Sequence, residues 1–239
     1  MQLRSLIKTP LQRLGYDIVK LHRTTSFAQR RQALLQRHAA DLVLDVGANV
    51  GAYALELRDN GYTGRIVSFE PRTAAFRQLR AAAAGDAAWE IRQLALGREC
   101  GTATLNVSSN AYSSSLLKML PSHLEAEPEA KFIGTEQVVL ATLDSLFPEF
   151  APPARHAFLK IDTQGLERAV IDGGLGVVDR ICGFQMELSL QPLYEGETLF
   201  PEMLPLMQAL GFRLALIQPG IHHPESGDTL QLDAVFCRR

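Results

Sequence analysis

The sequence has few cysteines, no long apolar run and no apolar leader, and each shortage excludes a class of protein. Its three cysteines, Cys100, Cys182 and Cys237, lie far apart among 239 residues and form no CxxC pair. This pattern excludes a disulfide framework and a zinc knuckle, and it suits reduced thiols. No run approaches the roughly 18 apolar residues that a membrane span needs. Because the N-terminus also lacks the apolar core of a secretory signal, we expect a cytoplasmic protein.

The net charge is also small, but it is unevenly distributed. Residues 1–40 carry eight Lys and Arg against one acid, which gives +7, so the remaining 199 residues carry −9 of the total of −2. A nucleic-acid-binding protein is usually basic over its main body, and that class is therefore disfavoured. The 46% hydrophobic content suits one substantial core with an appendage. We divide the chain into a basic helical arm, 1–40, and one domain, 41–239.

Short β-branched runs alternate with helical patterns through that domain. We expect strands at 41–47, 65–71, 89–96, 157–162, 180–188, 212–218 and 230–237, and helices at 50–60, 73–84, 164–173 and 201–210. The region 101–140 interrupts this alternation with two expected strands, 102–108 and 136–141, and is interpreted as an insertion. The alternation predicts an α/β fold with a mainly parallel sheet covered on both faces. Ligands bind such sheets beyond the carboxyl ends of the strands.

The segment DVGANVG, residues 45–51, is typical of a strand that runs into a glycine-bearing turn and a helix, which is a nucleotide site. A dinucleotide-binding turn would carry glycine where Asn49 stands, although Asn tolerates positive φ. A buried Asp45 would repel a pyrophosphate and favour an ammonium group, which S-adenosylmethionine has. Glu70, at the end of the next strand, is placed to accept hydrogen bonds from ribose hydroxyls. The alternative is that Asp45 and Glu70 each cap a helix.

Several segments together resemble the FkbM-type family of class I S-adenosylmethionine-dependent methyltransferases. They are DVGANVGAYA (45–54), VSFEP (67–71), QLALG (93–97), SSSL (113–116), LDSL (143–146), LKIDTQGLERAVIDGG (159–174) and FQMELS (184–189). The resemblance implies a Rossmann-like, seven-stranded sheet with a reversed last hairpin, and O-methyl transfer, often to a sugar in surface-glycan synthesis. It also implies cofactor contacts from Asp45, Gly47, Asn49, Gly51 and Glu70, with Ala95 beside the adenine.

Two carboxylates at strand ends are candidates for the chemistry of the acceptor. Asp162 follows Lys160 by two residues on one strand face, and an adjacent ammonium would keep it ionised. Glu187 ends the neighbouring strand. The pair could act as base and orienter, or could hold Mg²⁺ by oxygen ligation. Alternatively, Asp162 caps the helix that starts near Gln164 and pairs with Lys160, and Glu167 is a charge in the first helical turn.

Other candidates lie in loops. His222, or its neighbour His223, could be the general base because an imidazole titrates near neutrality, although loop histidines are more often bystanders. The serine-rich loop 106–117, with Tyr112, either lines the acceptor pocket or is a solvated loop. For Tyr194 we favour core packing over stacking on a sugar ring.

The apolar residues of the N-terminal arm recur at helical spacing, interrupted by Pro10 and Gly15. We favour a pair of helices that cover the cofactor site over a basic surface that rests on anionic lipid. The first functional hypothesis is an O-methyltransferase that acts on a sugar or glycan. A second is a non-catalytic scaffold in glycan assembly. The third, an NAD-linked sugar oxidoreductase, is disfavoured by Asn49.

Overall fold

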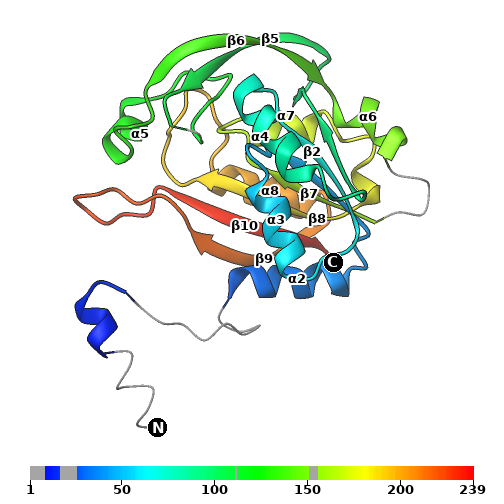
Figure 1. Ribbon diagram of the computed structural model, residues 1–239, viewed down its shortest axis with the longest axis horizontal. Helices are drawn as coiled ribbons and strands as arrows, with labels where there is room; N and C mark the ends of the chain where they lie inside the picture. The colour runs from blue at the N-terminus through cyan, green and yellow to red at the C-terminus, as the bar shows by residue number, and fades with distance from the viewer. Residues whose placement is uncertain (1–8, 17–25, 111, 151–155) are drawn as a thin grey trace.

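The computed structural model describes residues 9–16, 26–110, 112–150 and 156–239. Within these ranges the centre is a seven-stranded sheet in the order β3-β2-β1-β7-β8-β10-β9 (Figure 1). Its strands are β1 (Leu42–Val46), β2 (Arg65–Phe69), β3 (Trp89–Arg92), β7 (Ala157–Ile161), β8 (Ile181–Ser189), β9 (Phe212–Pro219) and β10 (Gln231–Arg238). Neighbours pair in parallel except β10, which is antiparallel to β8 and β9. The predicted Rossmann-like sheet with an antiparallel last strand is confirmed.

Helices cover both faces of this sheet. In the described part of the chain, one face carries α2 (Phe27–Arg37), α3 (Ala52–Asp59) and α4 (Thr73–Ala83), and the other carries α6 (Leu143–Phe150), α7 (Glu167–Asp172) and α8 (Phe200–Ala209). The helix α2 begins after Ser26, whose hydroxyl accepts the backbone N–H of Gln29. Burial of an apolar stripe from each helix gives the sheet a core on both sides.

The strand alternation decides which side chains reach the functional face. In β1, Leu44 and its alternate neighbours pack under α6, α7 and α8, whereas Val43 packs under α2, α3 and α4. Asp45 therefore lies on the face of α2 to α4, because successive side chains of a strand point to opposite faces. The same alternation in β7 places Lys160 on that face, and the two residues pair in register.

The predicted insertion is a small second sheet. Its order is β4-β6-β5, with β4 (Ala95–Leu96), β5 (Gly101–Ser108) and β6 (Phe132–Ala141), and the short helix α5 (Pro121–Ala126) lies between β5 and β6. The long β5–β6 ribbon lies at the top of the view in Figure 1, apart from the main sheet.

Two sequence expectations about elements were wrong. The strand expected at 89–96 is two strands in two sheets, because the chain leaves the main sheet after Arg92 and Ala95 pairs with Leu140 of β6. The helix expected from residue 164 begins at Glu167, because Gln164 and Gly165 both have positive φ. In addition, the helix α6, which contains Pro148, was not among the expected elements.

Part of the N-terminal arm lies outside the described residues, namely 1–8 and 17–25. Residues 9–13 are helical, and α2 is the remaining described helix of the arm. Among the helices that the structure describes, none is long and apolar enough to span a bilayer.

Candidate functional site

A cavity of about 500 Å³ opens at the carboxyl ends of the parallel strands. Among the residues expected at the site, those that line it are Gly47, Asn49, Glu70, Ala95, Lys160, Asp162 and Glu187. Three other expected residues, Asp45, Gly51 and His222, do not belong to its lining. Residues of α2, of the serine-rich loop and of β8 and β10 also line the cavity. It therefore extends beyond the turn after β1.

The turn between β1 and α3 needs the residues that it has. Gly47 has φ +75°, and a Cβ there would lie 1.8 Å from the carbonyl oxygen of Asp162, so the turn passes directly against the end of β7. Asn49 has φ +50°, which confirms that Asn permits this turn. Gly51 has φ +92° and lies against the Trp89 side chain, 2.9 Å from where its Cβ would be. Position 51 therefore needs glycine so that the Trp89 side chain can pack behind the turn.

Glu70 closes one side of this turn. Its Oε2 accepts the backbone N–H of Asn49 at 2.8 Å and its Oε1 accepts that of Arg72 at 2.7 Å. Burial raises the pKa of Glu70 to about 7, against these two hydrogen bonds. The capping alternative holds in part, since Arg72 is the N-cap residue of α4. Each carboxylate oxygen keeps a second lone pair for a ligand hydroxyl.

Asp45 lies beneath the turn and is fully buried. Its Oδ2 accepts the hydroxyl of Ser68 at 3.0 Å, and its Oδ1 lies 3.3 Å from Lys160 Nζ. Asp45 thus pairs with the ammonium group of Lys160, and that it contacts the cofactor stays a prediction. The capping alternative for Asp45 is wrong, because α3 has no side-chain cap at its N-terminus.

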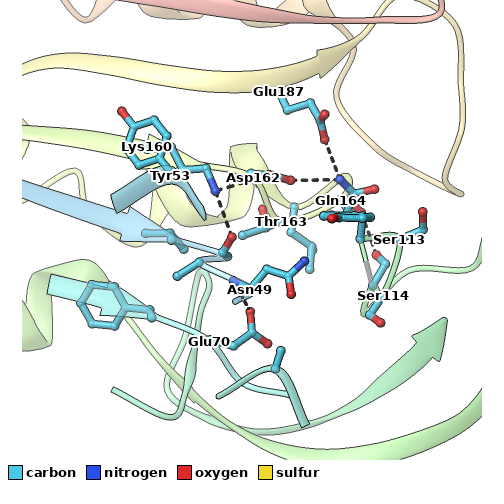
Figure 2. Close-up of a pocket in the computed structure, with 18 of the residues that line it drawn as sticks. Asn49, Tyr53, Glu70, Ser113, Ser114, Lys160, Asp162, Thr163, Gln164 and Glu187 are labelled. Carbon is cyan, nitrogen blue, oxygen red and sulfur yellow. Dashed lines mark hydrogen bonds and ion pairs between the residues drawn. The ribbon is translucent and has the colours of Figure 1, made fainter. Parts of the chain in front are cut away.

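Lys160 joins the turn to the carboxylate pair. Its Nζ donates to the carbonyl oxygen of Gly47 at 2.9 Å and lies 3.3 Å from Asp162 Oδ2 (Figure 2). Burial alone would lower the pKa of Lys160, but the carboxylates of Asp162 and Asp45 raise it above the ordinary lysine value. The ammonium therefore stays charged within the site.

The structure brings Asp162 and Glu187 together through a residue that the sequence analysis did not assign to the site, Gln164. Its Nε2 donates to Asp162 Oδ1 at 3.0 Å and to Glu187 Oε2 at 2.6 Å (Figure 2). Burial, followed by the negative charges of Asp162 and Asp233, raises the pKa of Glu187 well above its ordinary value. The sequence signal for Gln164 was the Gln-Gly pair directly after a strand, which favours a turn.

The structure agrees only in part with the structural alternatives for Asp162 and Glu167, in which Asp162 caps a helix and pairs with Lys160 and Glu167 is a charge in the first helical turn. Asp162 pairs with Lys160 as expected, but α7 begins five residues later and Asp162 does not cap it. Glu167 lies in the first turn of α7, as expected, and its Oε1 accepts the N–H and hydroxyl of Thr163. Burial raises the pKa of Glu167 to about 7.

The far end of the cavity is covered by α2 through Arg31, which was also missed from the sequence. Its side chain is 2% exposed, its guanidinium lies 4.6 Å from the ring centre of Tyr53, and it donates to Glu56 at 2.8 Å and to Gln185 at 3.3 Å. Gln185 in turn donates to Asp233 at 2.9 Å. This end of the cavity is therefore lined by paired polar side chains from α2, α3, β8 and β10.

Residues 112–116 of the serine-rich loop line the cavity, and that they contact an acceptor stays a prediction. Ser113 and Ser115 are buried, and Ser115 donates its hydroxyl to the carbonyl oxygen of Gln164 at 2.7 Å. Tyr112 lines the mouth and stays 69% exposed. Tyr194 is fully buried, as favoured, and its hydroxyl donates to Gln164 Oε1 at 2.7 Å.

The structure does not bring the loop histidines to the carboxylates. His222 is exposed and its Nδ1 lies 3.2 Å from the Thr229 hydroxyl in the hairpin after β9. The Nδ1 of His223 accepts backbone N–H groups of Glu225 and Ser226. Among the described residues, no group of three or more His, Cys, Asp or Glu side chains is arranged to hold a metal ion.

Comparison with known proteins gives one family match. The profile of the Methyltransferase FkbM domain matches residues 45–214. Three solved structures with low similarity are a methyltransferase FkbM from Methylobacillus flagellatus KT, the N-terminal domain of human METTL16 with SAH, and the 1,6-didemethyltoxoflavin-N1-methyltransferase of Burkholderia thailandensis with S-adenosylhomocysteine. Their identities are 12%, 10% and 14%, and their TM-scores are 0.48, 0.48 and 0.47.

The shares of chain that these comparisons cover differ. The first covers 82% of this chain and 43% of the other, so this chain spans less than half of that protein. The second covers 99% and 82%, and the third 99% and 87%, of this chain and of the other respectively. No curated protein matches the sequence.

Proposed function

The chain belongs to the FkbM methyltransferase family, whose domain profile matches residues 45–214, and we propose that it transfers a methyl group from S-adenosylmethionine to a hydroxyl oxygen of a sugar or glycan. One observation carries the proposal. A single cavity holds Glu70 and the open turn of Gly47 on one side, and the Asp162–Glu187 pair on the other. A cofactor and an acceptor bound in this cavity would therefore meet beside two carboxylates.

The turn side of the cavity suits the nucleoside. Gly47 leaves its backbone bare, and Glu70 offers a free lone pair on each oxygen to ribose hydroxyls. Ala95 and Leu96 of β4, with Leu105 of β5, supply an apolar wall for a base. Since S-adenosylmethionine carries no phosphate, this acidic and apolar lining suits it better than a dinucleotide.

The carboxylate side suits the acceptor. S-adenosylmethionine supplies an electrophilic methyl group when bound, and an attacking hydroxyl must lose its proton. Asp162 lies at the end of β7, facing the cavity and paired with Lys160, where it is placed to accept that proton. Glu187, whose pKa burial raises, keeps a proton more readily and so orients the hydroxyl by a hydrogen bond. The main contribution of the protein is alignment of the two reactants.

The polar lining beyond the carboxylates supports a polyhydroxylated acceptor. Gln185, Gln218, Gln231 and Asp233 all line this end of the cavity. The Oε1 of Gln231 is buried and has no hydrogen-bond partner within the part of the chain that the structure describes. A buried acceptor atom of this kind is satisfied by a hydroxyl donor from a ligand. Sugar hydroxyls supply donors of this kind.

The test is transfer of isotope-labelled methyl groups to glycans taken from cells that lack this protein. We expect label in the glycan with the purified protein, a mass gain of one CH₂ group per methyl, and at least about a hundredfold slower transfer with Asp162→Asn. Label in a non-glycan molecule alone would contradict the acceptor class. Cofactor binding with no transfer to any acceptor would instead favour the scaffold alternative.

A further inference from the structure

The side-chain amide of Gln164 lies between the carboxylates of Asp162 and Glu187. One nitrogen, Nε2, lies 3.0 Å from Asp162 Oδ1 and 2.6 Å from Glu187 Oε2, so each carboxylate receives one of its two hydrogens (Figure 2). The two acceptors come from different elements, the end of β7 and the strand β8. A single amide group thus links two acidic side chains that come from different strands.

The orientation of this amide follows from its partners. Tyr194, which is fully buried, donates its hydroxyl to Gln164 Oε1 at 2.7 Å. If the amide were rotated by half a turn, its oxygen would face two carboxylate oxygens and its nitrogen would face a hydroxyl hydrogen. The observed orientation therefore satisfies all three partners, whereas the rotated one would set the amide oxygen against the carboxylate of Asp162.

The backbone is held in an unfavourable conformation at this residue. Gln164 has φ +55°, in the left-handed region that side chains other than those of Gly, Asn and Asp rarely adopt. Its carbonyl oxygen accepts the hydroxyl of Ser115 at 2.7 Å, and the residue is 8% exposed. Strain of this kind persists where the surroundings fix it, and it concentrates at functional sites.

We propose that Gln164 is the positioning residue of this site, and that its amide takes the place that a divalent cation would take between Asp162 and Glu187. A cation at this point needs oxygen ligands, whereas the third group here presents N–H donors and turns its oxygen to Tyr194. The residues present therefore do not fit Mg²⁺, and the Mg²⁺ alternative for Asp162 and Glu187 is replaced by this arrangement. Lys160 supplies the positive charge beside Asp162.

This inference rests on the proposed function for its catalytic meaning. If Asp162 accepts the hydroxyl proton, its oxygen must be held within about 0.5 Å of its productive position, and a fixed amide achieves this without an ion. The link from Gln164 through Ser115 and Tyr194 to the serine-rich loop also ties the pair to the wall of the acceptor pocket.

The test is Mn²⁺ binding to the purified full chain, measured as the loss of the EPR signal of free Mn²⁺. In Gln164→Glu an oxygen replaces the amide nitrogen, so three carboxylates converge while Tyr194 keeps its acceptor. We expect one saturable site in this variant, at least about tenfold tighter than any binding to the wild type. The matched control is Gln185→Glu, because Gln185 Nε2 faces a single carboxylate, that of Asp233, and should gain no site.

Each outcome of the Mn²⁺ titration either supports or overturns the proposal. Equal Mn²⁺ binding by the wild type and Gln164→Glu would overturn the proposal, and so would equal binding by the two variants. If the circular dichroism spectrum of Gln164→Glu differs from that of the wild type, the proposal is tested on the wild type alone. Micromolar Mn²⁺ that broadens the carboxyl ¹³C signals of Asp162 and Glu187 would then contradict it, and unbroadened signals would support it. Calorimetric binding of S-adenosylmethionine to the same samples tests the proposed function separately.

Discussion

The ammonium group of Lys160 lies 3.3 Å from the fully buried carboxylate of Asp45, on the strand beside it. This pair lies directly beneath the turn that carries Gly47, whose carbonyl oxygen accepts a hydrogen bond from the same ammonium at 2.9 Å. Asp45, which begins the turn motif, therefore acts on the cavity through Lys160, from a position beneath the turn. Its role is to hold Lys160 in place, and Lys160 holds both the turn and Asp162.

Replacement of Lys160 by Met should leave Asp45 as an uncompensated buried charge. We expect the free energy of unfolding to fall by about 3–5 kcal/mol, as is typical when one partner of a buried ion pair is removed. Urea unfolding at neutral pH measures this change. The double variant Lys160→Met/Asp45→Asn should recover a large part of the loss, because it removes the buried charge. A single-variant loss below about 1 kcal/mol would show that the pair is not structural.

Two glycines with similar backbone conformations should respond differently to alanine. Gly47 and Gly61 have φ +75° and +85°, but only at Gly47 would a Cβ collide with backbone, 1.8 Å from the Asp162 oxygen. Gly61→Ala should cost only the conformational strain, about 1 kcal/mol. Gly47→Ala should cost about 3 kcal/mol or more, since the turn must move away from β7. Thermal unfolding of both variants is the measurement, and equal losses would contradict the close approach.

Glu70 should make stability depend on pH. Its pKa is about 7 in the folded protein against 4.5 when unfolded, so its stabilising contribution is complete below pH 4.5 and is lost as the pH rises through 7. The loss amounts to up to about 3 kcal/mol. Relative to Glu70→Gln, the wild type should therefore lose stability between pH 5 and pH 8. Parallel stability curves for the two proteins over this range would refute the raised pKa.

Arg31 should hold α2 over the cavity. Arg31→Leu removes its hydrogen bonds to Glu56 and Gln185 and its contact with Tyr53. We expect amide hydrogen exchange in 27–37 to speed up about tenfold or more, given the strength of charged hydrogen bonds. The neighbouring, exposed Arg30 provides the control, and Arg30→Leu should leave exchange unchanged. Equal effects of the two substitutions would indicate that α2 is held by its apolar face alone.

The sequence was sufficient to predict elements that carry a local signal. Alternating β-branched runs located β1, β2, β7, β8, β9 and β10 within about two residues. Local signals failed where tertiary pairing decides. The run WEIRQLAL reads as one strand, but its second half pairs with β6, which lies about forty residues further along the chain. The helix α6 is stabilised by burial of Phe147 and Phe150, which outweighs the unfavourable Pro148.

The site was predictable to the same extent. Strand ends placed Asp162 near Glu187, because parallel strands end at one edge of a sheet. The residues that complete the site depend on distant partners: Arg31 bonds Gln185, 154 positions away, and Gln164 bonds Tyr194, 30 positions away. No spacing rule carries such information. His222 was expected at this edge, but it lies in the hairpin between β9 and β10, exposed and bonded to Thr229.

The central claim is that the cavity binds S-adenosylmethionine against the turn of Gly47 and Glu70. Isothermal titration calorimetry of the wild type with S-adenosylmethionine, and with NAD as the comparison, tests it most directly. We predict one site per chain for S-adenosylmethionine, binding at least about tenfold weaker in Glu70→Ala, and no measurable heat with NAD. Absence of S-adenosylmethionine binding, or tighter binding of NAD, would contradict the account.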